Sequence, residues 1–511
     1  MSRTRRAAIN VVFGYAGFVM SLLTGIALVP FTLARVGTET YGVWLGFGEL
    51  LGYSAMLDIG ILGILPWLVA EADGASDRGE IRRVFVGGLT LSVITGVVVC
   101  AVALGLLLAA PYVARVSDAQ RAAVFGPLVM AVACTFVAYP LRACHAVLVG
   151  LQDVVFVGWA ALAQQALAIA VLVTLLLRGQ GIWAVAASTS VPALVVAAVS
   201  AARLRRRAPD LFRGWARPAK ATLVRITGQG FGGWTAGLGW RMVSATDNLV
   251  ILSVAGPAMA VVYAMTVKLA EALTQMSWHL VDSGMVGLAQ LRGEGRVQRV
   301  REIVVAMLRL TLLGAGAVAC VVVALNPSFV SLWVGTAKFG GVAMNAWVAA
   351  EVVALSLTHG LFAPAATLGQ RVQTGWAVVA QGVFHVGAAV LLGHWFGATG
   401  VVAAGFVSSM LVAYPAGVRL VSRASGLAHG DLLRGAVLPW AARIAPLLVL
   451  AAAVALLRER VSPWAPLALA PFLGLTYLWT MRPLYRGIPL PGRIQGALAR
   501  LRLVPAVEPG G

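Results

Sequence analysis

Long apolar runs alternate with short polar connections along the whole chain. Most runs have about 20 to 28 residues, enough to cross about 30 Å of hydrocarbon as a helix that rises about 1.5 Å per residue. We therefore predict an all-α polytopic membrane protein with about 14 transmembrane helices. The expected spans are residues 9–34, 42–70, 84–110, 123–149, 155–177, 182–202, 226–255, 259–285, 303–326, 342–368, 376–395, 398–420, 437–457 and 463–481.

The longest polar connection between apolar runs, residues 203–225, lies near the middle of the chain. It carries eight of the 39 basic residues, one acid and two prolines. A linker of this composition between two groups of six helices predicts two lobes. The expected division is an N-terminal lobe over 1–202, a basic cytoplasmic linker over 203–225, a C-terminal lobe over 226–420, and helices 13 and 14 with a tail over 421–511.

A glycine pattern indicates that the two lobes are repeats. Three glycines at helix connections recur 219 positions later: Gly37, Gly150 and Gly181 correspond to Gly256, Gly369 and Gly400. Six spans per lobe restore the same orientation, so the pseudo-repeat is expected to be parallel, about an axis along the membrane normal. A cavity between such lobes is the natural place for a transported substrate.

The charge distribution orients the chain. Only 11% of the residues are charged, against about 25% in an average soluble domain. The net charge of +20 falls almost wholly between the apolar runs, so the positive-inside rule explains it better than nucleic-acid binding. With the N-terminus inside, 27 of the 39 basic residues lie on the inner side and seven on the outer. We predict a multi-pass protein of the cell (inner, cytoplasmic) membrane with both termini in the cytoplasm.

Several classes of chemistry lack the residues that they need. The four cysteines lie in or beside apolar runs without CxxC spacing, and no P-loop, HExxH or GxSxG motif occurs. The GQGFGG run at 228–233 matches a dinucleotide motif but follows a basic linker rather than a strand. The other connections are too short for an extramembrane catalytic domain. We expect no catalytic residue, no metal, no cofactor and no enzymatic activity.

One helix carries a polar stripe. The spacings of 3, 4, 4 and 3 between Lys268, Glu271, Gln275, His279 and Asp282 put all five residues on one face of the span 259–285. Each charge at membrane depth costs roughly 2.5–3.5 kcal/mol on insertion scales, so such a face needs water or protein beside it. We predict that it lines a cavity. The alternative is a set of ties between helices, in which Lys268 and Glu271 neutralise each other.

The span 226–255 brings a cation to mid-membrane. Arg241 and Asn248 lie on one helical face, with Asp247 beside them. A fixed guanidinium there is suited to hold a phosphate bidentately. The alternative is a salt bridge from Arg241 to an acid of the span 42–70 or the span 259–285.

The span 42–70 holds two acids, Glu49 and Asp58. They are nine residues apart and so lie on roughly opposite faces, which argues against a carboxylate pair. Both are candidate cavity residues, although Asp58 is equally suited to satisfy backbone groups beside Gly60. Three further polar residues stand alone in the pattern, and for the histidines we favour hydrogen bonds between helices over a proton relay: Glu351, His359 and His385.

The stretch LVPFTLARVGTETYGVWLGFGELLGYSAMLDIGILGILPWLVAEADG carries a family resemblance. A proline-containing first helix, VG-x-x-x-YG-x-W, a later D-x-G and an Ala-Glu exit make it similar to the polysaccharide-biosynthesis flippases. These form the O-antigen-type branch of the multidrug/oligosaccharidyl-lipid/polysaccharide (MOP, MATE-like) exporter superfamily. The second half repeats the theme with Asp247-Asn248-Leu-Val-Ile and Gly256-x6-Tyr263. The resemblance is sharp over residues 20–75, looser over 240–275, and topological elsewhere.

The resemblance implies a transporter with two lobes around a partly cationic cavity. Its substrate would be a polyprenyl-pyrophosphate-linked oligosaccharide, moved to the outer leaflet by alternating access for surface polysaccharide export. Arg241 and Lys268 would then serve the pyrophosphate. The implied partners are this lipid-linked oligosaccharide, the lipid bilayer and a polysaccharide polymerase or export machinery, with a monomer as the functional unit. Residues 9–34 carry no charge and so lack the basic-acidic pair of the lipid II flippases, which argues against that substrate.

Two other functions stay open at this point. A cation-coupled multidrug antiporter of the same superfamily would need a coupling carboxylate, for which Glu49, Asp58, Asp247 and Glu271 are candidates. A membrane glycan polymerase or glycosyltransferase would typically need a large outer loop, and the outer connections here are short.

Overall fold

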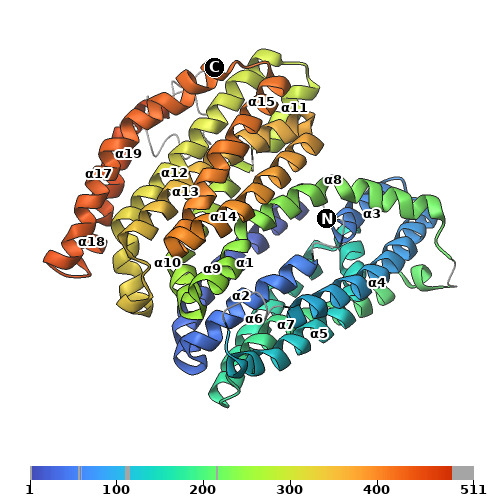
Figure 1. Cartoon of the computed structure of the whole chain (residues 1–511). Coiled ribbons are helices and arrows are strands. Elements are labelled where there is room, and N and C mark those ends of the chain that lie inside the picture. The colour runs from blue at the N-terminus through green and yellow to red at the C-terminus, as the bar shows by residue number, and fades with distance from the viewer. Residues whose placement is uncertain are drawn as a thin grey trace. The chain divides into compact units, whose positions relative to one another are not determined.

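The computed structural model describes residues 3–55, 58, 60–109, 116–213, 217–282 and 284–485, and these are almost entirely helical (Figure 1). The described residues contain no strand, and the described part of each of the fourteen predicted spans is mainly helical. The prediction of an all-α fold is therefore confirmed.

The helices follow one another through short connections. The first nine are α1 (Arg3–Val36), α2 (Thr38–Ala55), α3 (Ile61–Gly74), α4 (Arg78–Ala109), α5 (Asp118–Gly150), α6 (Val154–Leu177), α7 (Ile182–Arg207), α8 (Lys220–Ser244) and α9 (Thr246–Ala255). They are followed by α10 (Pro257–Asp282), α11 (Met285–Gly293), α12 (Val297–Val334), α13 (Gly341–Ala365), α14 (Arg371–Ser408), α15 (Tyr414–Ser425), α16 (His429–Leu432), α17 (Leu438–Arg460), α18 (Ala465–Ala468) and α19 (Ala470–Thr480).

The chain forms two compact units. The first contains the residues up to Arg241 together with Asn248–Val261, and the second contains Met242–Asp247 and the residues from Val262 onward. Most of α8 and α9 thus belongs to the first unit, although the sequence analysis assigned them to the C-terminal lobe. The predicted lobe boundaries stay a prediction.

In the first unit, α5 packs against α3, α4 and α7, while α6 packs against α1 and α7. Small residues allow the close approach of helices that membrane proteins favour. A Cβ on Gly88 of α4 would overlap the Leu65 side chain of α3, and one on Gly150 would overlap Val69.

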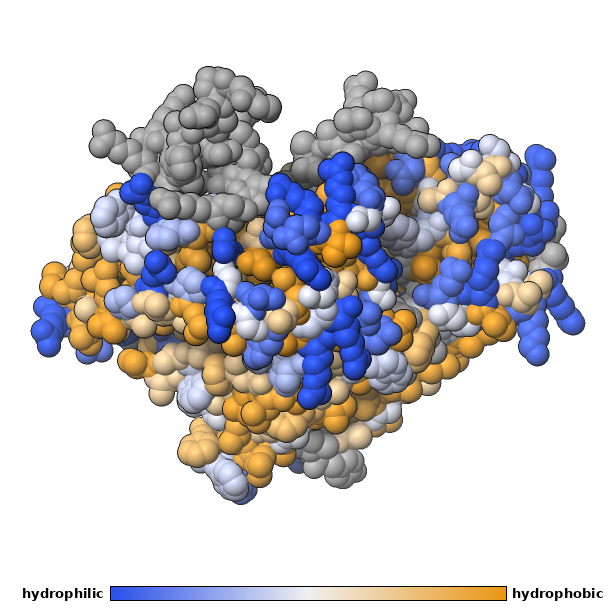
Figure 2. Space-filling model, turned by 90° about the horizontal axis from the view of Figure 1, so that it is seen from above, coloured by the Kyte–Doolittle hydropathy of each residue, from blue (hydrophilic) through white to orange (hydrophobic). Residues whose placement is uncertain are grey.

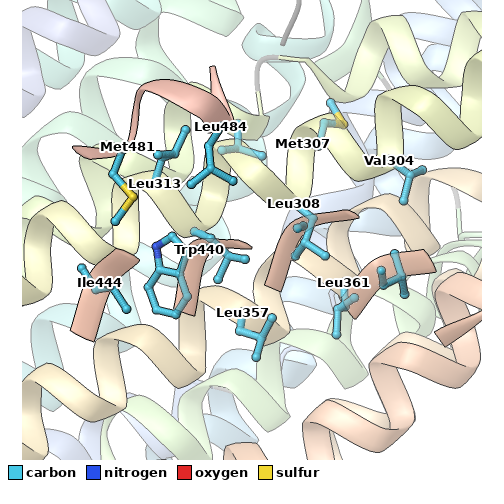
Figure 3. Packing of buried hydrophobic residues seen from close by; sticks show 14 of the residues in the cluster. Val304, Met307, Leu308, Leu313, Leu357, Leu361, Trp440, Ile444, Met481 and Leu484 are labelled. Carbon is cyan, nitrogen blue, oxygen red and sulfur yellow. The ribbon is translucent and has the colours of Figure 1, made fainter. Parts of the chain in front are cut away.

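In the second unit, α12 packs against both α13 and α17. Figure 3 shows the buried side chains of this core, among them Trp440 of α17 and Leu313 and Leu308 of α12. The hydroxyl of Tyr477 in α19 donates to the Leu313 carbonyl at 2.5 Å, which ties α19 to the same core.

The spans 42–70 and 226–255 each contain a helix break, and a further break separates two predicted spans. The span 42–70 breaks between α2 and α3 at Gly60, which has φ 73°, and a Cβ there would overlap the Gly230 carbonyl of α8. The span 226–255 breaks at Ala245 between α8 and α9. Within α14, Gly397 has φ 60° and separates the two spans predicted at 376–395 and 398–420.

One pair of glycines in the predicted repeat has the same backbone conformation. Gly37 between α1 and α2 has φ 84°, and Gly256 between α9 and α10 has φ 85°. Both glycines lie in the left-handed region, where a residue with a Cβ is strained. Each accepts a hydrogen bond from the residue four positions later. This matching geometry supports the pseudo-repeat, which as a whole stays a prediction.

Much of the helical surface is apolar. By length and composition, eight described helical segments can cross a membrane, one of them the run from Gly341 to Ser425. Figure 2 views the end at which α11 and α15 lie in Figure 1; hydrophilic residues gather there and hydrophobic residues border them. Apolar side chains stay exposed on helices such as α4, where Ile94 is 54% exposed. These features are those of a multi-pass membrane protein.

Basic residues of the predicted linker bind acids of the first unit. Asp153, between α5 and α6, pairs with Arg203 at 3.1 Å and with Arg207 at 2.6 Å. At the start of α4, Glu80 pairs with Arg225 of α8. The two ends of the linker are therefore fixed to neighbouring helices.

We expect Asp153→Asn to destabilise the protein by about 1 kcal/mol at pH 7. Burial disfavours the charge of Asp153, but hydrogen bonds and charges from Arg207 and Arg203 outweigh it and hold the pKa of this carboxyl below its usual value. Because the pKa of Asp153 is lower in the folded protein, its ion pairs stabilise the fold at pH values above the unfolded pKa of about 3.9. This stabilisation disappears as the pH falls through the folded pKa. Thermal unfolding in detergent from pH 7 to pH 3 should show the two proteins converging at the acid end.

Glu294→Gln is the matched control for Asp153→Asn. Glu294 pairs with Arg296 at 3.0 Å, but both side chains are more than half exposed. Its removal should leave the unfolding temperature unchanged at every pH. Equal unfolding temperatures of Asp153→Asn and the wild type at pH 7 would contradict a stabilising role for the ion pairs of Asp153.

Candidate functional site

The polar stripe predicted for the span 259–285 lies on α10, and all five of its side chains are exposed: Lys268, Glu271, Gln275, His279 and Asp282. Lys268 Nζ lies 3.6 Å from Glu271 Oε2, and these side chains are 49% and 50% exposed. The neutralising pair considered as an alternative therefore exists, and it lies on an exposed surface. A membrane helix with such a face requires water or a polar ligand beside it.

The last turn of α10 is tied to α13. His359 Nε2 lies 2.9 Å from Asp282 Oδ1, and the His359 ring stacks on Trp278 with centroids 4.3 Å apart. The Trp278 indole donates to Ser356 Oγ at 3.0 Å. His359 thus makes the hydrogen bond between helices that was expected of it.

In the first unit, Arg241 of α8 forms a salt bridge with Glu49 of α2. Arg241 Nη2 lies 2.6 Å from Glu49 Oε2, and Asn248 Nδ2 donates to the other carboxylate oxygen at 3.4 Å. Gly52 makes room for the guanidinium, because a Cβ there would overlap it. The structure thus shows the salt bridge that the sequence left as an alternative, to an acid of the span 42–70.

This polar cluster retains open hydrogen-bonding positions. Within the described part of the chain, Arg241 Nε and Asn248 Oδ1 are buried without a hydrogen-bond partner. Arg241 and Glu49 nevertheless keep 31% and 21% of their side chains exposed. The guanidinium can therefore be reached by a ligand, and it has donors beyond those that Glu49 occupies.

Asp58 lies at the break between α2 and α3. Its Oδ2 accepts the backbone N–H of Leu62 at 3.1 Å in the first turn of α3. This is the backbone role considered for it beside Gly60. Glu49 binds Arg241 instead, so the two acids have different partners, as their spacing indicated.

The most buried acid of the predicted set is Asp247, at the start of α9 and in the second unit. Tyr263 of α10 donates its hydroxyl to Asp247 Oδ2 at 2.9 Å, and His385 Nε2 of α14 lies 2.9 Å from Oδ1. Asp247 is 2% exposed and His385 is 0% exposed. Glu351 of α13 is close enough to interact electrostatically with Asp247. Asp247 was predicted to line a cavity, and the structure places it in a buried cluster.

Sequence reasoning missed the partners of Asp247. His385 is 138 positions away and stands alone in the pattern, so no helical period connects the two. Tyr263 had a signal, because the resemblance quotes it together with Asp247 in the second half of the chain, 16 positions apart. In the part of the chain that the structure describes, no three His, Cys, Asp or Glu side chains are grouped as a metal site.

No protein-family model matches this chain, and no curated protein matches it in sequence. Its fold is similar to solved transporter structures. The lipid II flippase MurJ in an inward closed conformation has a TM-score of 0.64 at 10% identity, covering 94% of this chain and 99% of that one. A multidrug resistance MATE family transporter of the MOP superfamily, inward-facing, has a TM-score of 0.57 at 17% identity, covering 82% and 99%.

A third structure, a MATE protein in complex with MaD5, has a TM-score of 0.56 at 16% identity and covers 83% of this chain and 97% of that one. The TM-scores establish a shared fold, and identities this low leave the substrate open. The chain therefore shares the fold of these MATE transporters and of MurJ.

Proposed function

We propose that the protein is a flippase for a polyprenyl-pyrophosphate-linked oligosaccharide or a related lipid-linked glycan. The protein would move this glycan across the cytoplasmic membrane by alternating access and so serve surface polysaccharide export. The observation that carries the proposal is the exposed polar face of α10 from Lys268 to Asp282. At about 1.5 Å per residue this face is about 21 Å long, most of a hydrocarbon core of about 30 Å. A polar path of this length suits a large hydrophilic headgroup better than a single bound ion.

Arg241 is the group that we assign to the pyrophosphate. Its charge is balanced by Glu49 in this structure, so Arg241 is not an uncompensated cation at membrane depth. A pyrophosphate can compete with the carboxylate for the guanidinium fork, which binds phosphate oxygens in pairs. Lys268, paired with the exposed Glu271, offers a second cation, a compact ammonium charge rather than a fork.

Reconstitution tests the proposal. In proteoliposomes containing a lipid-linked oligosaccharide, the protein should make inner-leaflet glycan accessible to an impermeant glycosidase added outside. Gln275→Leu should slow this several-fold, because an apolar side chain interrupts the polar face. Met276→Leu is the matched control on the neighbouring exposed position and should behave as wild type. Efflux of ethidium with no movement of glycan would refute the proposal.

The second candidate is a cation-coupled multidrug antiporter. The observation that favours it is the buried Asp247 with Tyr263 and His385, because antiport needs a titratable group inside the membrane. In the same proteoliposomes, an imposed pH or sodium gradient would then drive ethidium efflux. Asp247→Asn would abolish that efflux, whereas a flippase without such coupling would not respond to the gradient.

A further inference from the structure

The first unit contains a cavity with polar lining residues, away from the Arg241 cluster. It has a volume of about 500 Å³ and lies between α1, α6 and α7. Its polar lining residues are Thr24 of α1, Gln164 and Gln165 of α6, and Ser188 and Thr189 of α7. Every other described lining residue is apolar, so the described lining is polar in part and carries no charge.

This cavity lies at membrane depth. Thr24 is 12 residues before the end of α1 at Val36, and Gln165 is 12 residues before the end of α6 at Leu177. At about 1.5 Å per residue, both are about 18 Å from those helix ends. Both ends lie on the side that the charge distribution predicts to be outer.

The cavity offers hydrogen bonds that the protein does not use. Among the described residues, no hydrogen bond involves the side-chain amide of Gln164 or Gln165, and each amide has two donors and one acceptor. Thr24 donates to the Met20 carbonyl at 2.6 Å and Thr189 to the Ala186 carbonyl at 2.9 Å. Their oxygens therefore remain available as acceptors. Unpaired amides are costly in a membrane, so the cavity must hold water or a ligand.

Helix packing explains why the space exists. A Cβ on Gly158 of α6 would overlap the Phe13 ring of α1, so the two helices are close at that level. Phe13 also packs edge-on against Trp159, with centroids 5.6 Å apart. Further along, small residues of α6 such as Ala161 and Ala168 face the cavity and leave it unfilled.

We propose that this cavity binds neutral, hydroxyl-rich groups, namely sugar units of the transported glycan. The inference rests on the proposed function. Amides and hydroxyls with both donors and acceptors match sugar hydroxyls, whereas an uncharged lining offers no partner to an anion or a cation. The volume lies within the usual range of small-molecule sites, about 300–1,000 Å³.

Cysteine protection tests the binding. Thr189→Cys, in the full chain with Cys100, Cys134, Cys144 and Cys320 replaced by alanine, places a thiol at the cavity. Chitotetraose or maltotetraose should slow its labelling by a maleimide at least about threefold, and Gln164→Leu with Gln165→Leu should remove this protection. Protection by tetraphenylphosphonium alone, or by none of these probes, would overturn the proposal. Monodisperse elution of each variant verifies folding.

Glycan movement in proteoliposomes separates this inference from the proposed function. The double leucine variant should translocate lipid-linked oligosaccharide at least about tenfold more slowly than wild type. Gln180→Leu, in the exposed connection between α6 and α7, is the matched control and should not change the rate. Wild-type flux in the double variant overturns the sugar site and leaves the flippase intact. Protection by the oligosaccharides without glycan flux in the wild type would refute the flippase and keep the site.

Discussion

Arg241→Ala is expected to reduce glycan translocation by at least about tenfold while the protein still inserts and folds. The substitution removes the mid-membrane cation assigned to the pyrophosphate and leaves Glu49 with its hydrogen bond from Asn248. The measurement is glycosidase accessibility of lipid-linked oligosaccharide in proteoliposomes. Arg443→Ala is the matched control, because Arg443 of α17 donates to the Pro439 carbonyl of its own helix and should not affect transport.

Glu49→Gln distinguishes an anion-binding Arg241 from a purely structural one. If Arg241 binds the pyrophosphate, the Glu49 carboxylate competes with the pyrophosphate for the guanidinium. Glu49→Gln should therefore lower the substrate concentration needed for half-maximal flux. If Arg241 only neutralises Glu49, both substitutions break the same pair and should impair the protein alike. Gly52→Ala provides a third test, since the added Cβ would displace the guanidinium from its present place. Equal losses in Glu49→Gln and Arg241→Ala would rule out the pyrophosphate role.

His385→Ala is expected to destabilise the second unit by about 3 kcal/mol, because it leaves the buried Asp247 with one partner fewer. Equilibrium unfolding in mixed detergent would measure the loss. Asp247→Asn in the same background should recover part of it, since an uncharged amide is less costly to bury than a carboxylate and can still accept the Tyr263 hydroxyl.

A second histidine–aspartate pair supplies the control for His385→Ala. His359 lies 2.9 Å from Asp282, the same distance as His385 from Asp247. The side chains of His359 and Asp282, however, are 23% and 43% exposed. His359→Ala should therefore cost less than His385→Ala, on the order of 1 kcal/mol including its stacking on Trp278. Similar losses in the two variants would show that burial of Asp247 is not the cause.

The helices and the polar face of α10 follow from sequence alone. Apolar runs of spanning length and the positive-inside rule depend on local composition, and the described part of every predicted span is mainly helical. The α10 stripe follows from helical spacing, and its five residues are exposed as a set. The left-handed glycines Gly37 and Gly256 also lie at predicted connections. All of these features depend on residues within a few turns of one another.

Tertiary structure decided which polar groups meet. The sequence placed Arg241 at mid-membrane but allowed acids from two spans, and packing of α8 beside α2 selected Glu49. His385 stood alone in the sequence, yet it is hydrogen-bonded to Asp247, 138 positions away. Nothing in the sequence indicated the cavity beside Gln164 and Gln165, because it forms only where three helices pack together. Hydropathy and helical period describe one helix at a time, whereas these contacts depend on which faces of distant helices pack together.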